Sequence, residues 1–224
     1  AHQWRQPLSV ISTISSSLKI KKEMNILDDK EFYEALNNIN KTSEHLSNTI
    51  DDFRNFFSPN KEMNKFYVSQ LIKKSKDLIK SRFDKFNIKV IENIDDIEIL
   101  SYQNELFQVI LNLFSNSIDV LSSSQIENKI IYIKIYHDEN NLYIEFLDNG
   151  GGIKDEFINR VFEPYFTTKH KSQGTGIGLY MSLQIVTKHL NGEISVKNDT
   201  FIENNTAYFG AKFTILLPIH LQKN

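Results

Sequence analysis

The chain has 224 residues, of which 40% are hydrophobic and 24% charged, the composition of an ordinary globular protein. Its net charge of −2 gives no electrostatic case for binding nucleic acid or an anionic membrane surface. The absence of cysteine excludes disulfides, thiolate catalysis and cysteine-based zinc sites, and no apolar run approaches the roughly 20 residues that span a bilayer.

Residues 1–60 are predicted to form a helical hairpin. Over residues 32–57, apolar or small residues recur in alternating steps of four and three, which is the period of helical bundles. A shorter apolar stripe runs through residues 8–18, and the polar segment between the two stripes is predicted to be a turn in which Asp28 or Asp29 caps the second helix. One hairpin cannot bury both stripes by itself. We therefore expect two copies to pair into a four-helix bundle, which would make the protein a homodimer.

Residues 61–224 are predicted to form a second domain of mixed helices and strands. Helices are expected near 68–82, 104–122 and 179–190, and strands near 88–91, 131–135, 142–146, 193–197 and 208–217. The last helix is expected to end with Gly192 in the position after the C-cap. Helices mixed with antiparallel strands in this way predict an α+β fold, a two-layer sandwich in which helices cover a sheet.

The predicted helix at 104–122 carries a narrow polar strip between two apolar faces. At 100° per residue, the strip consists of Glu105, Gln108, Asn112, Asn116 and Asp119. A solvated helix edge explains such a strip, although in this lysine-rich chain a solvated edge should carry lysines, and the strip has none. Its amide and carboxylate oxygens also suit a hard cation such as Mg²⁺, so both interpretations stay open.

A glycine segment, DNGGGI at 148–153, follows a predicted strand. A flexible turn explains it. Glycines also let a flat ring or a phosphate approach the backbone, while the carboxylate of Asp148 accepts a hydrogen bond from an amino group.

A second glycine segment, GTGIGL at 174–179, opens a predicted helix, and backbone N–H groups at a helix start favour an anion. It is neither a P-loop nor a dinucleotide fingerprint, because GxxxxGK[ST] is absent and the G-x-G-x-x-G spacing fails. The segment before it, 161–171, mixes aromatic residues with lysines and is typical of a mobile lid over phosphates.

In this order, the motifs over residues 64–219 resemble the ATP-binding domain of sensor histidine kinases. The superfamily of that domain also includes gyrase B, MutL and a heat-shock chaperone. The resemblance implies the Bergerat fold, with ATP and Mg²⁺ as ligands. The N-box would be 112–119, the first glycine box 148–152, the F-box 162–166 and the second glycine box 174–178. The implied ATP-binding residues are Asn112, Asn116, Asp119, Asp148, Gly150, Gly152, Ile153, Phe162, Phe166, Lys169, Lys171, Gly174, Thr175, Gly176, Gly178 and Leu179.

The resemblance also implies individual roles. Asn116 would bind Mg²⁺, and Asp148 would accept a hydrogen bond from the adenine amino group. Asn112 stands where chaperone-type relatives have a catalytic glutamate. An amide cannot take a proton from water, which argues against simple ATP hydrolysis. Asp119 replaces a lysine of many relatives and would bind a Mg²⁺-linked water or pair with a lid lysine, while Lys212 lies near where relatives often have a threonine close to adenine.

The opening stretch, HQWRQPL at 2–8, resembles the H-box of the His-x-x-x-Gln-Pro-Leu subgroup of these kinases. A histidine near a helix start is usually only solvated, but the resemblance makes His2 the phosphoacceptor, because a neutral imidazole has a free ring nitrogen to attack phosphorus. Gln6 lies one turn further along and would orient water for dephosphorylation of the partner. The family usually has an acidic residue after the histidine. Gln3 can fix the imidazole tautomer but is not a base, and Pro7 either kinks the helix or begins it.

The implied function is a protein histidine kinase, the core of a sensor that phosphorylates itself on His2 with ATP. It would then pass the phosphoryl group to an aspartate in the receiver domain of a response regulator. We expect a cytoplasmic location, either free or as the cytoplasmic part of a membrane-anchored sensor, with no contact to nucleic acid and none to the membrane by this segment. Two alternatives stay open: an ATPase of the same superfamily, and a non-catalytic dimeric scaffold with a degenerate nucleotide site.

Overall fold

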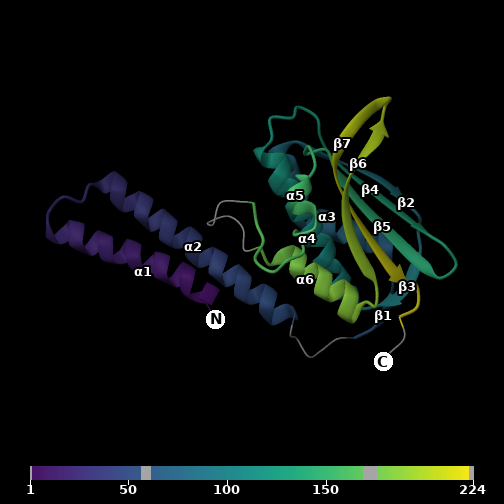
Figure 1. The fold of residues 1–224 in the computed structure, drawn as a ribbon, viewed down its shortest axis with the longest axis horizontal. Coiled ribbons are helices and arrows are strands. Elements are labelled where there is room, and N and C mark those ends of the chain that lie inside the picture. Colours follow the sequence, from purple (N-terminus) through teal and green to yellow (C-terminus); the bar gives the residue numbers. More distant parts are fainter. Residues whose placement is uncertain (1, 57–61, 169–175, 222–224) are drawn as a thin grey trace. The chain divides into compact units, whose positions relative to one another are not determined.

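A computed structural model describes residues 2–56, 62–168 and 176–221, which fall into two compact units. The first unit contains the hairpin of helices α1 (His2–Glu23) and α2 (Asp29–Phe56), and the second contains the remaining elements (Figure 1). Because α1 begins at His2, Pro7 lies inside the helix, and a helix that starts at Pro7 is ruled out.

The turn between α1 and α2 is held at one end by a backbone cap and at the other by a side-chain cap. Asn25 takes a left-handed conformation with φ of 54°, and the Ile26 N–H donates to the Lys21 carbonyl at 3.0 Å, the pattern of a Schellman motif. Asp28 then accepts from the Glu31 N–H at 2.7 Å, which confirms it as the N-cap of α2. An ion pair between Lys21 and Glu31 joins the two helices beside the turn.

The apolar stripes of the hairpin stay open in a single chain. Among the described side chains from residue 8 to residue 43, none is buried. Leu8 is 53% exposed, Phe32 38% and Leu36 36%. Burying these side chains requires another surface, which is the situation of half a helical bundle.

The second unit is built on a five-stranded sheet in the order β2-β4-β5-β7-β6. Its strands are β2 (Ile88–Ile94), β4 (Lys129–His137), β5 (Asn141–Asp148), β6 (Glu193–Glu203) and β7 (Thr206–Pro218). The expected antiparallel pairing holds except that β2 runs parallel to β4. Strands β1 (Asn64–Tyr67) and β3 (Glu98–Ser101), which were not predicted, form a separate two-stranded sheet.

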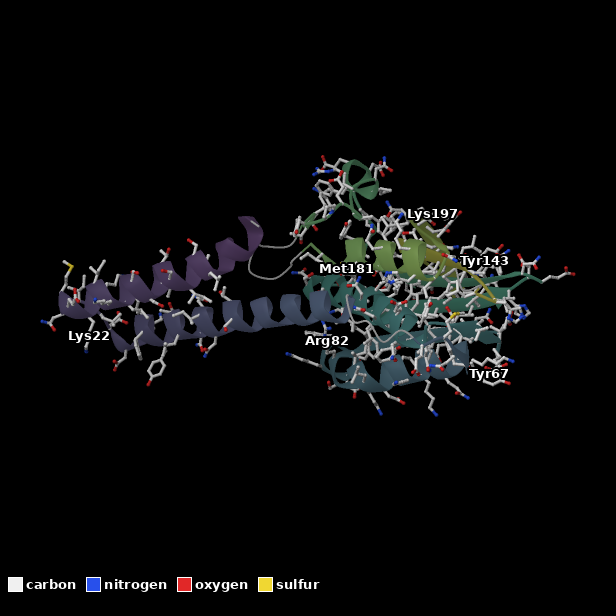
Figure 2. All side chains as sticks on the ribbon, turned by 90° about the horizontal axis from the view of Figure 1, so that it is seen from below. Lys22, Tyr67, Arg82, Tyr143, Met181 and Lys197 are labelled. Atoms are coloured by element: carbon white, nitrogen blue, oxygen red, sulfur yellow. The ribbon has the colours of Figure 1, made fainter. Side chains whose placement is uncertain are left out.

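Three helices cover one face of the five-stranded sheet, which confirms the two-layer α+β sandwich (Figure 1). They are α3 (Val68–Phe86), α4 (Gln103–Ser123) and α6 (Gly178–Gln184), and α6 continues as a π-helical turn over Ile185–His189. The short α5 (Asp155–Ile158) follows the first glycine segment. In Figure 2, Arg82 and Met181 mark α3 and α6 of the helical layer, and Tyr143 and Lys197 mark strands β5 and β6.

The core lies between these two layers and follows the predicted alternation along the strands. The buried strand residues include Ile131, Ile133, Ile135, Leu142, Ile144 and Phe146. They meet the apolar face of α4, where the rings of Phe114 and Phe146 pack edge to face with centroids 5.0 Å apart. The polar strip of α4 is thereby turned away from the core and toward the glycine segments.

The end of the last helix differs from the prediction by one residue. Asn191, and not Gly192, takes the left-handed conformation after the helix, with φ of 48°. Asparagine tolerates this conformation because its short side chain bonds locally. Gly192 is needed for a different reason: a Cβ there would lie 2.2 Å from the Leu216 carbonyl oxygen of β7.

Candidate functional site

The polar strip of α4 is not a solvated edge. Near the start of the helix, Glu105 pairs with Nδ1 of His189 at 2.9 Å. In the middle of the helix, Nδ2 of Asn116 is buried and has no hydrogen-bond partner among the described residues. Such a donor costs about 1–3 kcal/mol, which marks Asn116 as a position that a ligand would satisfy.

Asn112 connects α4 to the start of α6. Its Nδ2 donates to the Ser182 hydroxyl at 2.8 Å, and its Oδ1 faces Gly178 so closely that a Cβ there would be 2.3 Å away. Gly178 is therefore required for close packing of the second glycine box against α4. Asn112 is anchored to the protein, whereas the side-chain amide of Asn116 stays unsatisfied among the described residues.

Asp148 ends β5 as a buried carboxylate, only 4% exposed. One oxygen accepts from the Gly150 N–H at 2.9 Å and the other from the Ser117 hydroxyl at 3.2 Å, and the Ala211 N–H also donates to this side chain. Burial raises the pKa of Asp148 above its ordinary value, and the three hydrogen bonds oppose that rise. The result is a fixed acceptor at the end of a strand, beside α4.

Glycine residues let three segments close around Asp148. A Cβ on Gly150 would lie 2.3 Å from Cγ1 of Val120, so the first glycine box packs directly on α4. A Cβ on Gly210 would lie 1.8 Å from the Asp148 carbonyl oxygen, so β7 can pass the carboxylate only with glycine at this position.

Asn198 of β6 holds the first glycine box in place. Its Oδ1 accepts from the Ile153 N–H at 2.8 Å and its Nδ2 donates to the Ile153 carbonyl at 2.7 Å. The neighbouring Gly152, with φ of 80°, passes close to the same side chain. Sequence reasoning missed Asn198, because nothing local marks an asparagine within a strand as the partner of a loop 45 residues away.

The F-box and the second glycine box meet through their backbones. The Tyr165 N–H donates to the Gly176 carbonyl at 2.7 Å, and a Cβ on Gly176 would lie 2.4 Å from the Tyr165 carbonyl carbon. Phe162 packs against Phe213 of β7, with ring centroids 6.4 Å apart. Phe166 packs on Phe157 of α5, with ring centroids 5.5 Å apart. The predicted lid residues Lys169, Lys171, Gly174 and Thr175 lie outside the described residues.

One expected position is corrected, and another residue has a partner that was not predicted. Asp119 pairs with Arg82 of α3, at 2.8 Å from Nη2, while Lys169 and Lys171, the lysines predicted as its partners, lie outside the described residues. Lys212 lies on the face of the sheet away from the helices, where its Nζ is 2.8 Å from Glu145. The β7 residue beside Asp148 is Ala211.

The predicted phosphoacceptor segment lies in α1, but the side chains of His2, Gln3 and Gln6 are outside the described part of the chain. No helix of the described residues is both long enough and apolar enough to cross a membrane. Among the same residues, no group of three or more histidine, aspartate or glutamate side chains is placed to hold a metal ion. A cation here would depend on the amide of Asn116 together with oxygens of a bound ligand, the way Mg²⁺ is usually held beside phosphates.

Residues 101–221 match the family described as histidine kinase-, DNA gyrase B- and HSP90-like ATPase. Sporulation kinase E of Bacillus subtilis is 29% identical over 222 residues, which cover 98% of this chain and 28% of that protein. The signal transduction histidine-protein kinase AtoS of Escherichia coli is 26% identical over 227 residues, covering 100% of this chain and 34% of its own length. The chain thus spans about a third or less of the length of these curated relatives.

Solved structures of histidine kinases have the same fold. The catalytic domain of the kinase ThkA aligns with a TM-score of 0.59 at 25% identity, covering 71% of this chain and 97% of that one. ThkA solved in complex with the response regulator TrrA aligns with a TM-score of 0.72 at 23% identity, covering 98% of this chain and 59% of the other. The histidine kinase AdeS of Acinetobacter baumannii aligns over 98% of both chains, with a TM-score of 0.68 and 18% identity.

Proposed function

We propose, on the premise that the chain belongs to the histidine kinase-, DNA gyrase B- and HSP90-like ATPase family, that it is the kinase core of a two-component sensor. It would use ATP to phosphorylate His2 and then pass the phosphoryl group to an aspartate of a response regulator. One observation carries the proposal: the buried carboxylate of Asp148 is held between Ser117 of α4 and the first glycine box, beside the unsatisfied amide of Asn116.

The site suits ATP in its parts. Asp148 would accept a hydrogen bond from the adenine amino group at the deep end of the site. Gly150 lets the first glycine box pack directly on Val120 of α4, so the flat base would lie against this box beside Asp148. The phosphates would lie along the strip between Asp119 and Asn112, where the lid lysines and the backbone N–H groups of Gly176 and Gly178, near Asn112, would neutralise charge.

Asn116 would hold Mg²⁺ through its amide oxygen, in the orientation that exchanges its two amide atoms. A hard cation that takes one protein oxygen and several phosphate oxygens is consistent with the lack of a carboxylate cluster among the described residues. When bound, Mg²⁺ neutralises phosphate charge. The chain's own residues would bind the base, orient the phosphates and supply the acceptor.

The reaction would begin with the lone pair of a neutral His2 ring nitrogen. That nitrogen forms a bond to the γ-phosphorus while the bond from phosphorus to the β–γ bridging oxygen breaks, and ADP leaves. The proton on the other ring nitrogen would go to water or to a carboxylate, because Gln3 has no basic group. Asn112 also lacks a basic group, which disfavours direct hydrolysis of ATP by water.

The hairpin supports the remaining part of the proposal. Its exposed apolar stripes would pair with those of a second copy to form a four-helix bundle. The surface of that bundle around His2 would receive the receiver domain, and Gln6 would orient water for the reverse dephosphorylation. The complex solved for ThkA with its regulator is consistent with this assignment for a protein of the same fold.

Incubation of the chain with Mg²⁺ and ATP radiolabelled at the γ-phosphate tests the proposal. Wild type and the matched control His137→Ala, an exposed histidine of β4, should gain a label that acid removes and alkali does not. His2→Ala should gain none. A label that persists in His2→Ala would refute the acceptor assignment. Steady phosphate release without any label would favour the ATPase alternative, and failure to bind Mg²⁺-ATP would favour the scaffold.

A further inference from the structure

Arg82 of α3 lies against the nucleotide-facing helix α4. Its Nη2 donates to Asp119 at 2.8 Å and its Nη1 donates to the Ser115 hydroxyl at 3.2 Å. Ser115 and Asp119 are four residues apart, so one guanidinium spans a full turn of the helix. The Arg82 side chain is 38% exposed and that of Asp119 37%, so both lie at the surface of the domain.

The position of Arg82 is opposite the first glycine box across the strip. Ser117 and Val120, which contact Asp148 and Gly150, define one flank of α4. Positions 115 and 119 define the other flank, because they lie more than a quarter of a turn away around the helix. A nucleotide on the strip would therefore have the glycine box on one side and the Arg82 guanidinium on the other.

Asp119 creates an electrostatic problem for such a nucleotide. It lies seven residues from Asn112, hence almost directly in line with it, two turns along the same face. A carboxylate there repels a triphosphate, because like charges a few ångströms apart destabilise each other. A cation beside Asp119 offsets that repulsion, and among the described residues Arg82 forms an ion pair with it.

We propose that Arg82 binds the phosphate chain of the nucleotide, with Asp119 and Ser115 holding its guanidinium in place. This inference rests on the proposed function. The guanidinium has five N–H donors in a planar fork, of which these two contacts use two, so others remain for phosphate oxygens. Asp119 then acts as a positioning residue, because its charge orients the Arg82 guanidinium. In this interpretation Arg82 supplies the positive charge that many relatives have in a lysine at the position of Asp119.

Isothermal titration of the full chain with ATP, ADP and adenosine, all with Mg²⁺, tests the inference. Arg82→Ala should weaken ATP and ADP binding about tenfold, the effect of one charge-assisted hydrogen bond, and leave adenosine binding unchanged. Arg82→Gln should lose the same interaction with less loss of packing. Lys80→Ala removes an equal charge from an exposed position on the same helix and should change none of the affinities.

The Asp119→Ala background separates phosphate binding from mere neutralisation of Asp119. If Arg82 binds phosphate, adding Arg82→Ala to Asp119→Ala still weakens ATP binding, by less than tenfold because Arg82 has already lost the residue that positions it. The inference is overturned if that second step has no effect, or if the arginine variants weaken ATP and adenosine equally. If the wild type binds neither ATP nor adenosine, the proposed function is overturned. If the wild type and Arg82→Ala bind ATP equally well, the proposed function stands and only the role of Arg82 is overturned.

Discussion

Replacing Asp148 by asparagine should separate nucleotide binding from stability of the ATP-binding domain. The amide has nearly the same shape, its oxygen can still accept from the Gly150 N–H, and its Nδ2 can donate to the Ser117 hydroxyl. The fold should therefore survive. The same Nδ2 is a donor and would face the adenine amino group, which is also a donor. The amino group of ATP therefore loses the charged acceptor that Asp148 provides.

The size of the effect follows from that single contact. A hydrogen bond to a charged group contributes about 1.5–3 kcal/mol, so ATP affinity should fall by roughly tenfold to 100-fold. Titration with Mg²⁺-ATP measures this, with a mutation on the far face of the sheet, Lys212→Ala, as a control for general damage. Wild-type affinity in Asp148→Asn would refute the assignment of Asp148 to adenine.

Asp148 also sets the pH dependence of stability. Because burial raises its folded-state pKa above the ordinary 3.8, its contribution to the free energy of unfolding is fully present below pH 3.8. That contribution is lost as pH rises through the folded pKa. At neutral pH the unliganded Asp148→Asn domain should therefore unfold at a higher temperature than wild type. Equal melting temperatures of wild type and Asp148→Asn from pH 3.8 to neutral pH would contradict the conclusion that burial raises the pKa of Asp148.

Three further predictions test how the site is held together. As pH rises through the folded pKa of Asp148, ATP affinity should increase, since adenine needs the ionised acceptor; titration at several pH values checks this. Gly210→Ala should destabilise the domain by about 3 kcal/mol in thermal denaturation, because its Cβ would lie 1.8 Å from the Asp148 carbonyl oxygen. Gly151→Ala should cost only about 1 kcal/mol, because its Cβ would meet no other atom and only the φ of 90° is unfavourable. Asn198→Ala should lose about 1–3 kcal/mol of stability and weaken ATP binding, because both backbone groups of Ile153 lose their partner, and unchanged affinity by calorimetry would show that the loop is held elsewhere.

Helices and central strands were predictable because each carries its own periodic pattern. The 3.5-residue repeat gave the second hairpin helix, and alternation gave the hairpin of β4 and β5. The four-residue strands β1 and β3 are too short to show a period, and the parallel pairing of β2 with β4 depends on a crossover that includes α4. Where pairing joins distant segments, periodicity within one segment holds no information about it.

The same limit separates the site residues that were predicted from those that were missed. Asn116, Asp148 and the glycines stand in compact motifs whose order along the chain indicates an ATP site. Arg82 and Asn198 act on partners 37 and 45 residues away, and each looks like an ordinary polar residue of a helix or strand. They support the motif residues from outside, so only the folded arrangement reveals them.

The error over Lys212 is different, because the sequence contained enough to avoid it. Phe213, Ile215 and Leu217 alternate on β7 and must face the core, so Lys212 must face the opposite side of the sheet. Lys212 lies near where relatives often have a threonine, but the period of two turns its side chain to the other face of the sheet. A shift of one residue moves a strand side chain to the other face, so the β7 residue beside Asp148 has to be Ala211, whose N–H donates to the carboxylate. The alternation along a strand therefore has to show which face of the sheet a side chain lies on before a comparison of motifs can assign a role to it.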